Sequence, residues 1–138
     1  MIVLDTSILS AMFRRREPQE PESPPVAVLR QIILEDRALG VPGIVVQEML
    51  SGIRSEGQFR ELQAVMEGFP ILVSSLPHHV SAARISNECG RRGITCTPVD
   101  CLIAAMAISV NGALFTTDKD FERMAPVCRL RLFAIEHL

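Results

Sequence analysis

Short apolar runs alternate with amphipathic stretches along most of the chain. The first run, Ile2-Val3-Leu4, is typical of a buried strand, and the apolar residues after it recur every three to four positions, as in a helix. This succession returns several times. Because the strand-like runs are continuously apolar, they predict a parallel sheet that is covered on both faces. The fold class that we predict is therefore α/β.

The predicted elements follow from the apolar spacing and from the positions of glycine and proline. The predicted strands are 2–4, 71–73, 113–116 and 130–135. The predicted helices are 8–13, 24–38, 44–53, 58–67, 77–89 and 99–110, and 118–123 forms a helical turn. The proline-rich segment 14–25 is expected to be an exposed loop. Breaks are expected at Gly40-Val41-Pro42-Gly43 and at Gly90 and Gly93.

Length and composition predict a single domain over residues 1–138. A chain of 138 residues with 48% hydrophobic residues buries about two-thirds of its extended surface on folding. No apolar run reaches the roughly 20 residues that a membrane span requires, and no signal for export is present. We therefore expect a cytoplasmic protein that does not enter a membrane.

Cysteines and net charge exclude further classes. The four cysteines form no CxxC pair and have no histidine at zinc-site spacing, so free thiols in a reducing compartment are expected. A formal net charge of −2 argues against a broad basic surface for nucleic acid. It does not exclude a protein whose bound metal ions contact the phosphates.

Four carboxylates stand at the ends or edges of the apolar elements. They are Asp5, Glu48, Asp100 and Asp118. An ionised carboxylate is costly to remove from water, so acids that converge near a core need cations or raised pKa values. Oxygen ligands without histidine favour Mg²⁺ or Mn²⁺. The four acids therefore predict a divalent-metal site.

Two of these acids come shortly after a predicted strand. In α/β folds, ligands bind beyond the carboxyl ends of the strands, where Asp5 and Asp118 are expected. Each also has a simpler interpretation. Asp5, with Thr6 and Ser7, is a good helix cap, and Asp118 is typical of a turn, where Thr117 caps the next helical turn and Asp118 points inward.

The other two acids lie within predicted helices. Glu48 is one turn after Ile44 and Val45, at the edge of the buried face, although a solvated helical glutamate is the commoner case. Asp100 stands at the start of an apolar, core-facing stripe, which makes it the strongest candidate of the four. A favourable interaction with the helix dipole is its alternative explanation.

Four motifs in order resemble the PIN-domain nucleases, most of all a VapC-type toxin. They are Val3-Leu4-Asp5-Thr6-Ser7, Gln47-Glu48-Met49-Leu50-Ser51-Gly52, Asp100-Cys101-Leu102-Ile103-Ala104-Ala105 and Thr116-Thr117-Asp118-Lys119-Asp120-Phe121. The resemblance spans essentially the full length. It implies a PIN-like three-layer fold with a central, mainly parallel sheet flanked by helices, and a Mg²⁺- or Mn²⁺-dependent endoribonuclease that hydrolyses RNA phosphodiester bonds. It also implies a cognate antitoxin and a homodimer.

Transferred position by position, the resemblance assigns a role to each motif residue. The catalytic positions match Asp5, Glu48, Asp100 and Asp118; the metal ligands match Asp5, Asp100 and Asp118, with Glu48 as a further candidate; and supporting roles fall to Thr6, Ser7, Thr117 and the less certain Asp120. The basic run Arg14, Arg15 and Arg16 is either a solvated charge cluster or a site for RNA phosphates.

Apolar residues between 26 and 67 are either core or a surface for a protein partner. They are Met49, Leu50, Ile53, Leu62, Val65 and Met66. Other functions also remain open: a housekeeping PIN-domain RNA-processing nuclease, a catalytically inactive PIN-like binding module, and a phosphatase with Asp5 as nucleophile. The phosphatase would want a second carboxylate two positions on, where the chain has Ser7.

Overall fold

Five parallel strands in the order β3-β2-β1-β4-β5 make up the sheet of this protein. The computed structural model describes residues 1–14 and 17–135. The strands are β1 (Ile2–Leu4), β2 (Leu39–Pro42), β3 (Ile71–Leu72), β4 (Ala113–Phe115) and β5 (Arg131–Leu132). The chain starts in the central strand, adds β2 and β3 on one side, and then returns to add β4 and β5 on the other.

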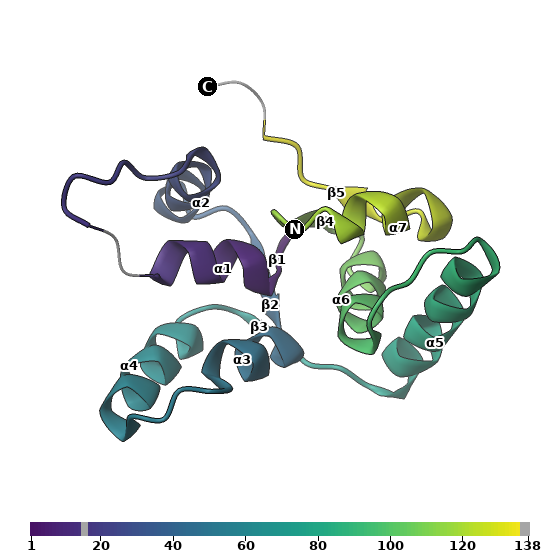
Figure 1. Cartoon of the computed structure of the whole chain (residues 1–138), viewed down its shortest axis with the longest axis horizontal. Coiled ribbons are helices and arrows are strands. Elements are labelled where there is room, and N and C mark those ends of the chain that lie inside the picture. Colours follow the sequence, from purple (N-terminus) through teal and green to yellow (C-terminus); the bar gives the residue numbers. More distant parts are fainter. Residues whose placement is uncertain (15–16, 136–138) are drawn as a thin grey trace.

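Seven helices flank the sheet within the described residues. They are α1 (Thr6–Phe13), α2 (Pro24–Leu34), α3 (Gly43–Leu50), α4 (Glu56–Glu67), α5 (Leu76–Arg91), α6 (Pro98–Ser109) and α7 (Asp120–Cys128). Figure 1 shows α1 to α4 on one side of the sheet and α5 to α7 on the other. The predicted three-layer α/β fold with a parallel sheet is confirmed, and the division into a single domain 1–138 stays a prediction.

The core lies between the sheet and both helical layers. All three residues of β1 are buried, as their unbroken apolar sequence predicted. Helix α6 is the most buried helix, since every residue from Cys101 to Ala107 is buried. The predicted strand at 113–116 corresponds to β4, whose Phe115 is fully buried and contacts Phe133, with ring centroids 4.9 Å apart.

Strand β2 was not predicted, because its sequence contains glycine and proline where a strand usually has apolar side chains. Val41 nevertheless pairs with Ile71 in the parallel register, and its N–H donates to the carbonyl of Pro70 at 2.9 Å. A Cβ on Gly40 would lie 3.0 Å from the side chains of Leu72 and Met1. Glycine therefore lets the neighbouring side chains pack closely against this strand.

Other predicted boundaries also differ from the structure. Helix α5 continues through Gly90, and the chain turns at Gly93, whose φ of 73° favours glycine. Helix α7 is a full helix over 120–128, where only a turn was predicted, and it contains Pro126 near its end. Strands β3 and β5 are shorter than predicted, with two residues each. Gly90 and Pro126 therefore lie within helices and do not end them where the sequence predicted a break or only a turn.

Candidate metal centre

Asp5 is the one charged or polar residue classed as buried in the described part of the chain, with 3% of its surface exposed. It follows β1 and caps α1. Its Oδ1 accepts hydrogen bonds from the N–H and the hydroxyl of Ser7, both at 2.6 Å, and from the N–H of Ile8 at 3.4 Å. Asp5 therefore caps α1 through Oδ1, as the sequence predicted. Its second carboxylate oxygen, Oδ2, takes no part in this cap.

Oδ2 of Asp5 accepts a hydrogen bond from Oγ1 of Thr116 at 2.5 Å. The parallel register pairs Leu4 with Phe115, so the residue after each strand reaches the same edge of the sheet. The sequence analysis gave Thr116 no role. The motif Thr116-Thr117-Asp118 was visible, but only the register between β1 and β4 selects the first threonine as the partner of Asp5.

Ser7 and Thr116 tie Asp5 to the loop that carries Asp118. The hydroxyl of Ser7 accepts a hydrogen bond from the N–H of Thr117 at 2.9 Å, and Oγ1 of Thr116 accepts one from the N–H of Asp118 at 2.9 Å. Ser7 therefore contacts both Asp5 and this loop, while its supporting role in catalysis stays a prediction. Thr117 contributes its backbone to this network.

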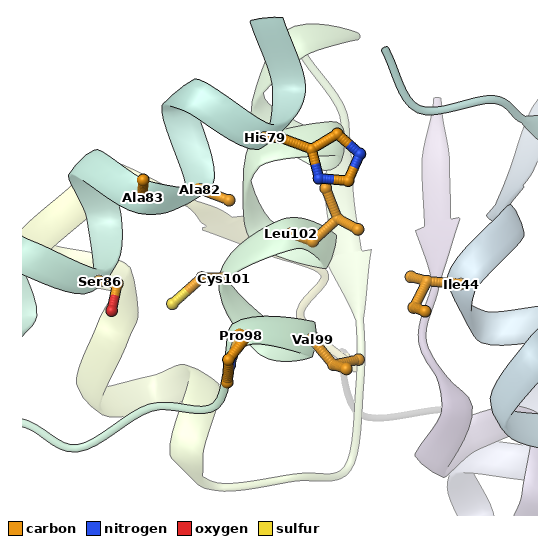
Figure 2. A pocket seen from close by; sticks show the side chains of 9 residues that line it. All are labelled: Ile44, His79, Ala82, Ala83, Ser86, Pro98, Val99, Cys101 and Leu102. Carbon is orange, nitrogen blue, oxygen red and sulfur yellow. The ribbon is translucent and has the colours of Figure 1, made fainter. Parts of the chain in front are cut away.

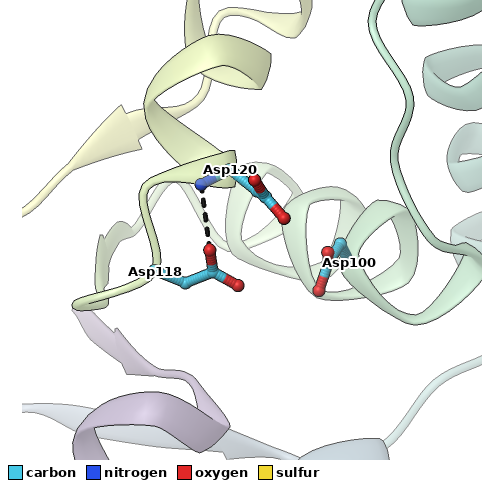
Figure 3. Close-up of side chains that lie close together, drawn as sticks. All are labelled: Asp100, Asp118 and Asp120. Atoms are coloured by element: carbon cyan, nitrogen blue, oxygen red, sulfur yellow. Dashed lines mark hydrogen bonds between the residues drawn. The ribbon is translucent and has the colours of Figure 1, made fainter.

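Asp100, Asp118 and Asp120 form the closest group of acids. One carboxylate oxygen from each lies within 4.8 Å of the others. Figure 3 shows Asp100 projecting from the first turn of α6 toward Asp118 and Asp120, which come from the loop after β4 and the start of α7. All three side chains are half-buried. Segments that are far apart in the sequence therefore converge on one acidic centre, which we call the aspartate cluster.

Asp120 belongs to this centre, although the sequence analysis ranked it below the other acids. Its N–H donates to Oδ1 of Asp118 at 2.9 Å, which begins α7 at Asp120 and fixes both carboxylates on one side. Asp118, and not Thr117, therefore accepts the hydrogen bond at the start of this helix. Asp120 also forms an ion pair with Arg123, one turn further along α7.

Burial disfavours ionisation of Asp100 and Asp5, and like charges add to this effect at Asp100. The pKa of Asp100 is raised above its ordinary value, first by burial and then by the negative charges of Asp118, Glu48 and Asp120, while a hydrogen bond with Thr97 opposes the rise. Burial also raises the pKa of Asp5, against the lowering effect of its hydrogen bonds from Ser7 and Thr116. A cation near the carboxylates would offset both effects.

Glu48 lies at the edge of this region, on α3. Its side chain is exposed, as in the solvated helical glutamate that the sequence analysis gave as the commoner case. Its Oε1 nevertheless accepts a hydrogen bond from the hydroxyl of Thr6 at 2.6 Å, and its charge acts on Asp100. The predicted supporting residue Thr6 therefore holds Glu48 toward the start of α1. Asp5 and Glu48 remain outside the aspartate cluster itself.

The arginine run is only partly described. Arg14 follows α1 and forms an exposed ion pair with Glu20 at 2.7 Å, while Arg15 and Arg16 lie outside the described residues. The guanidinium of Arg14 is thus already paired with a carboxylate. Its predicted binding of RNA phosphates stays a prediction.

The arrangement of five acids at one edge of the sheet can be compared with known proteins. The model of the PIN domain matches residues 2–126, which include every acid of the site. The chain belongs to the PIN-domain family.

Similar proteins extend over nearly the whole chain. It is 29% identical over 134 residues to the VapC ribonuclease Mb1587 of Mycobacterium bovis and to Ribonuclease VapC11 of Mycobacterium tuberculosis, and the match covers 95% of this chain and 96% of each relative. The structure of FitAcB from Neisseria gonorrhoeae is similar over 100% of both chains, with 26% identity and a TM-score of 0.75. VapBC-1 from nontypeable Haemophilus influenzae shares the fold at 22% identity, a TM-score of 0.75 and 98% coverage of both chains.

Several acids of the site lie at helix starts. Asp5 caps α1, and Asp100 and Asp120 lie in the first turns of α6 and α7. The positive ends of helix dipoles favour ionised carboxylates, so the fold partly compensates for their burial and mutual repulsion. Chemically, this gives a preformed set of oxygen ligands for a hard divalent cation.

Within the described residues, no helix is both long enough and apolar enough to cross a membrane.

Proposed function

We propose that this protein is a divalent-metal-dependent endoribonuclease, the toxin of a type II toxin-antitoxin pair, which hydrolyses RNA phosphodiester bonds in the cytoplasm. The observation that carries the proposal is the aspartate cluster, whose three carboxylates approach within 4.8 Å at the edge of a PIN-domain sheet. The ribonuclease names of relatives that match 95% of the chain support the choice of RNA as substrate.

The residues fit a hard divalent cation. The aspartate cluster offers only oxygen ligands, and its members are half-buried. Burial and then the neighbouring negative charges raise the pKa of Asp100. Such a set favours Mg²⁺ or Mn²⁺ over metals that prefer nitrogen or sulfur. We assign Asp100, Asp118 and Asp120 as ligands, with Asp5 and Glu48 as further candidates.

The protein residues keep the carboxylates oriented for catalysis. Ser7 and Thr116 donate to opposite oxygens of Asp5, so its carboxylate cannot rotate without losing hydrogen bonds. Thr6 holds Glu48 in the same way through Oε1. A bound divalent cation supplies charge neutralisation of the phosphate and a lowered pKa of the attacking water. We assign catalytic roles to Asp5, Glu48, Asp100 and Asp118 on this basis.

A groove beside the site is suited to the antitoxin. It has a volume of about 480 Å³ and lies between α1, α3 and α4. Its lining includes four apolar residues of the predicted partner surface, Met49, Ile53, Leu62 and Val65, and also Glu48. A partner segment in this groove would reach the catalytic acids. Met66, by contrast, is fully buried and belongs to the core.

A second copy of the chain is the other expected partner. Exposed apolar side chains lie near the start of α5 and the end of α6, among them Leu76 at 75% exposure and Val110 at 36%. The hydrogen bond between His78 and Ser109, 3.1 Å long, brings these two helix ends together. We propose this surface for the homodimer, because burying it removes apolar area from water.

The decisive experiment compares the purified wild type and two variants on a labelled RNA with Mg²⁺. Asp100→Asn should abolish cleavage while the far-ultraviolet circular dichroism spectrum stays unchanged. Asp36→Asn is the matched control, because Asp36 is exposed and its φ of 53° suits asparagine. Full cleavage by Asp100→Asn would exclude the proposed site. Cleavage by the wild type that persists in EDTA would exclude the metal.

A further inference from the structure

Cys96 and Cys101, which the sequence analysis treated as separate free thiols, lie side by side next to the candidate metal centre. Sγ of Cys101, in the first turns of α6, is 3.3 Å from Sγ of Cys96 in the preceding loop. A disulfide has an S–S distance of about 2.05 Å. The two sulfur atoms would need to approach by only roughly 1.3 Å to form this bond.

We propose that Cys96 and Cys101 form an oxidation site, whose disulfide constrains the first turn of α6. The bond would close a ring that contains Thr97, which caps α6 through its hydrogen bond to the N–H of Asp100. It would also contain Asp100 itself. The consequence for catalysis rests on the proposed function, whereas formation of the disulfide does not.

The surroundings of the two thiols give each a distinct part in the reaction. Cys96 is partly exposed, while Cys101 has 1% of its surface exposed. A cavity of about 410 Å³ between α5 and α6 is lined by Cys101 and Ser86, and Figure 2 shows the sulfur of Cys101 on the side of α6 that faces Ser86. Because Cys96 is the more exposed thiol, it should meet an oxidant from solution first, and Cys101, 3.3 Å away, is the neighbour that reacts next.

The oxidant is a peroxide, and the reaction balances in two steps. The Cys96 thiolate attacks one oxygen of hydrogen peroxide; an S–O bond forms, the O–O bond breaks, and the released hydroxide takes the thiol proton to give water. The Cys101 sulfur then attacks the sulfenic sulfur of Cys96, and the oxygen leaves as a second water with the Cys101 proton. Two electrons pass from the two sulfurs to the peroxide.

A metal-binding role for these cysteines fits the geometry less well. The aspartate cluster is the one group of three or more histidine, cysteine or acidic side chains in the described residues whose ligand atoms all lie within 4.8 Å. Cys89, which also interacts with Cys96, therefore does not complete a thiolate site with the pair. Because the three sulfur atoms do not all lie within 4.8 Å of one another, the close pair Cys96 and Cys101 favours a disulfide over a zinc site.

The full-length chain, purified in reductant and then freed of it, tests the proposal with hydrogen peroxide. Maleimide labelling after denaturation should fall from four thiols to two in the wild type, since the chain has four cysteines. Cleavage before Asp100 separates Cys96 from Cys101, so mass spectrometry of the fragments should find them joined by a bond that dithiothreitol breaks. Cys89→Ser is the matched control and should still lose two thiols.

Cys96→Ser should retain its three remaining thiols after the same treatment, and it should fold, because the position is partly exposed. Four labelled thiols in the treated wild type would overturn the proposal, as would a bond from Cys96 to Cys89. In the wild type, oxidation should lower RNA cleavage at least about tenfold by moving Asp100, and dithiothreitol should restore it. Undiminished cleavage by the disulfide form would overturn the constraint on α6. Absence of cleavage in the reduced wild type would instead refute the proposed function, while the thiol count would still decide the disulfide.

Discussion

Asp5 and the aspartate cluster lie at the same edge of the sheet, yet different groups compensate their charges. The carboxylate of Asp5 is buried and accepts hydrogen bonds from two hydroxyls and two backbone N–H groups. The cluster is half-buried, and its carboxylates face one another with fewer donors from the protein. The protein itself stabilises Asp5, whereas the cluster leaves room for a cation. The two regions therefore differ in how much of their negative charge the protein itself compensates.

Removing a member of the cluster should have the largest effect. Asp118→Asn should lower RNA cleavage about 100-fold or more, because it removes a ligand, while Thr116→Val should lower it about 10-fold, because it only loosens Asp5 and the Asp118 loop. Initial cleavage rates at saturating Mg²⁺ measure both. Equal losses in the two variants would mean that orientation by Thr116 matters as much as the ligand itself.

Cation binding should stabilise the protein through the cluster. At a Mn²⁺ concentration 100 times the dissociation constant, the free energy of unfolding should rise by about 2.7 kcal/mol. Urea denaturation with and without Mn²⁺ measures the change, and Asp100→Asn should lose most of it. The Asp36→Asn control should keep the full increase, and a wild type that is indifferent to Mn²⁺ would contradict the assignment of the cluster.

Without divalent cations, Asp5 should contribute more to the free energy of unfolding than Asp100 of the aspartate cluster. Without divalent cations, Asp5→Ala should lower the free energy of unfolding by about 2 kcal/mol, because Ser7 and Thr116 lose their acceptor and α1 loses its cap. Asp100→Asn should change it by less than about 0.5 kcal/mol, since removing a repelling charge offsets other losses. Denaturation in EDTA makes the comparison. A larger loss in Asp100→Asn would reverse the roles of the two regions.

The smallest expected effect is on the pH dependence of stability. The folded-state pKa values of Asp5 and Asp100 are raised above 3.8, so near and above that pH the folded chain holds protons that the unfolded chain has lost. Their contribution therefore favours folding at low pH and is lost as the pH rises through the raised pKa values. As the pH is raised from 3.8, melting temperatures in EDTA should show a weaker decline for Asp100→Asn than for the wild type. An identical pH dependence would contradict the shift at Asp100.

The sequence was sufficient to predict the fold class, because continuously apolar strands such as Ile2-Val3-Leu4 are typical of a parallel sheet that is covered on both faces. It was insufficient for β2, where Gly40 allows close packing and does not break the strand. Short strands at the edges were predicted too long. Where a strand ends depends on its pairing with a neighbouring strand, and the local pattern of apolar residues does not specify that pairing.

The site was predictable in its residue types and less so in its grouping. The motifs pointed to Asp5, Glu48, Asp100 and Asp118, and the structure brings them to one edge of the sheet. It adds Asp120 to the closest group, because α7 begins there. Thr116 was missed because its role depends on a contact with Asp5, 111 residues away, that only strand register specifies.

That long-range contact also affects when the site can exist during synthesis. β1 leaves the ribosome before its partner β4, and the Thr116 hydroxyl follows Asp5 by 111 residues. At about 5 to 20 residues per second, this delay lasts roughly 5 to 20 s. Until residues 113–120 emerge, Asp5 lacks its partner Thr116, and the aspartate cluster lacks Asp118 and Asp120. A nascent chain therefore cannot assemble this centre early, and products that stop before that point should be inert.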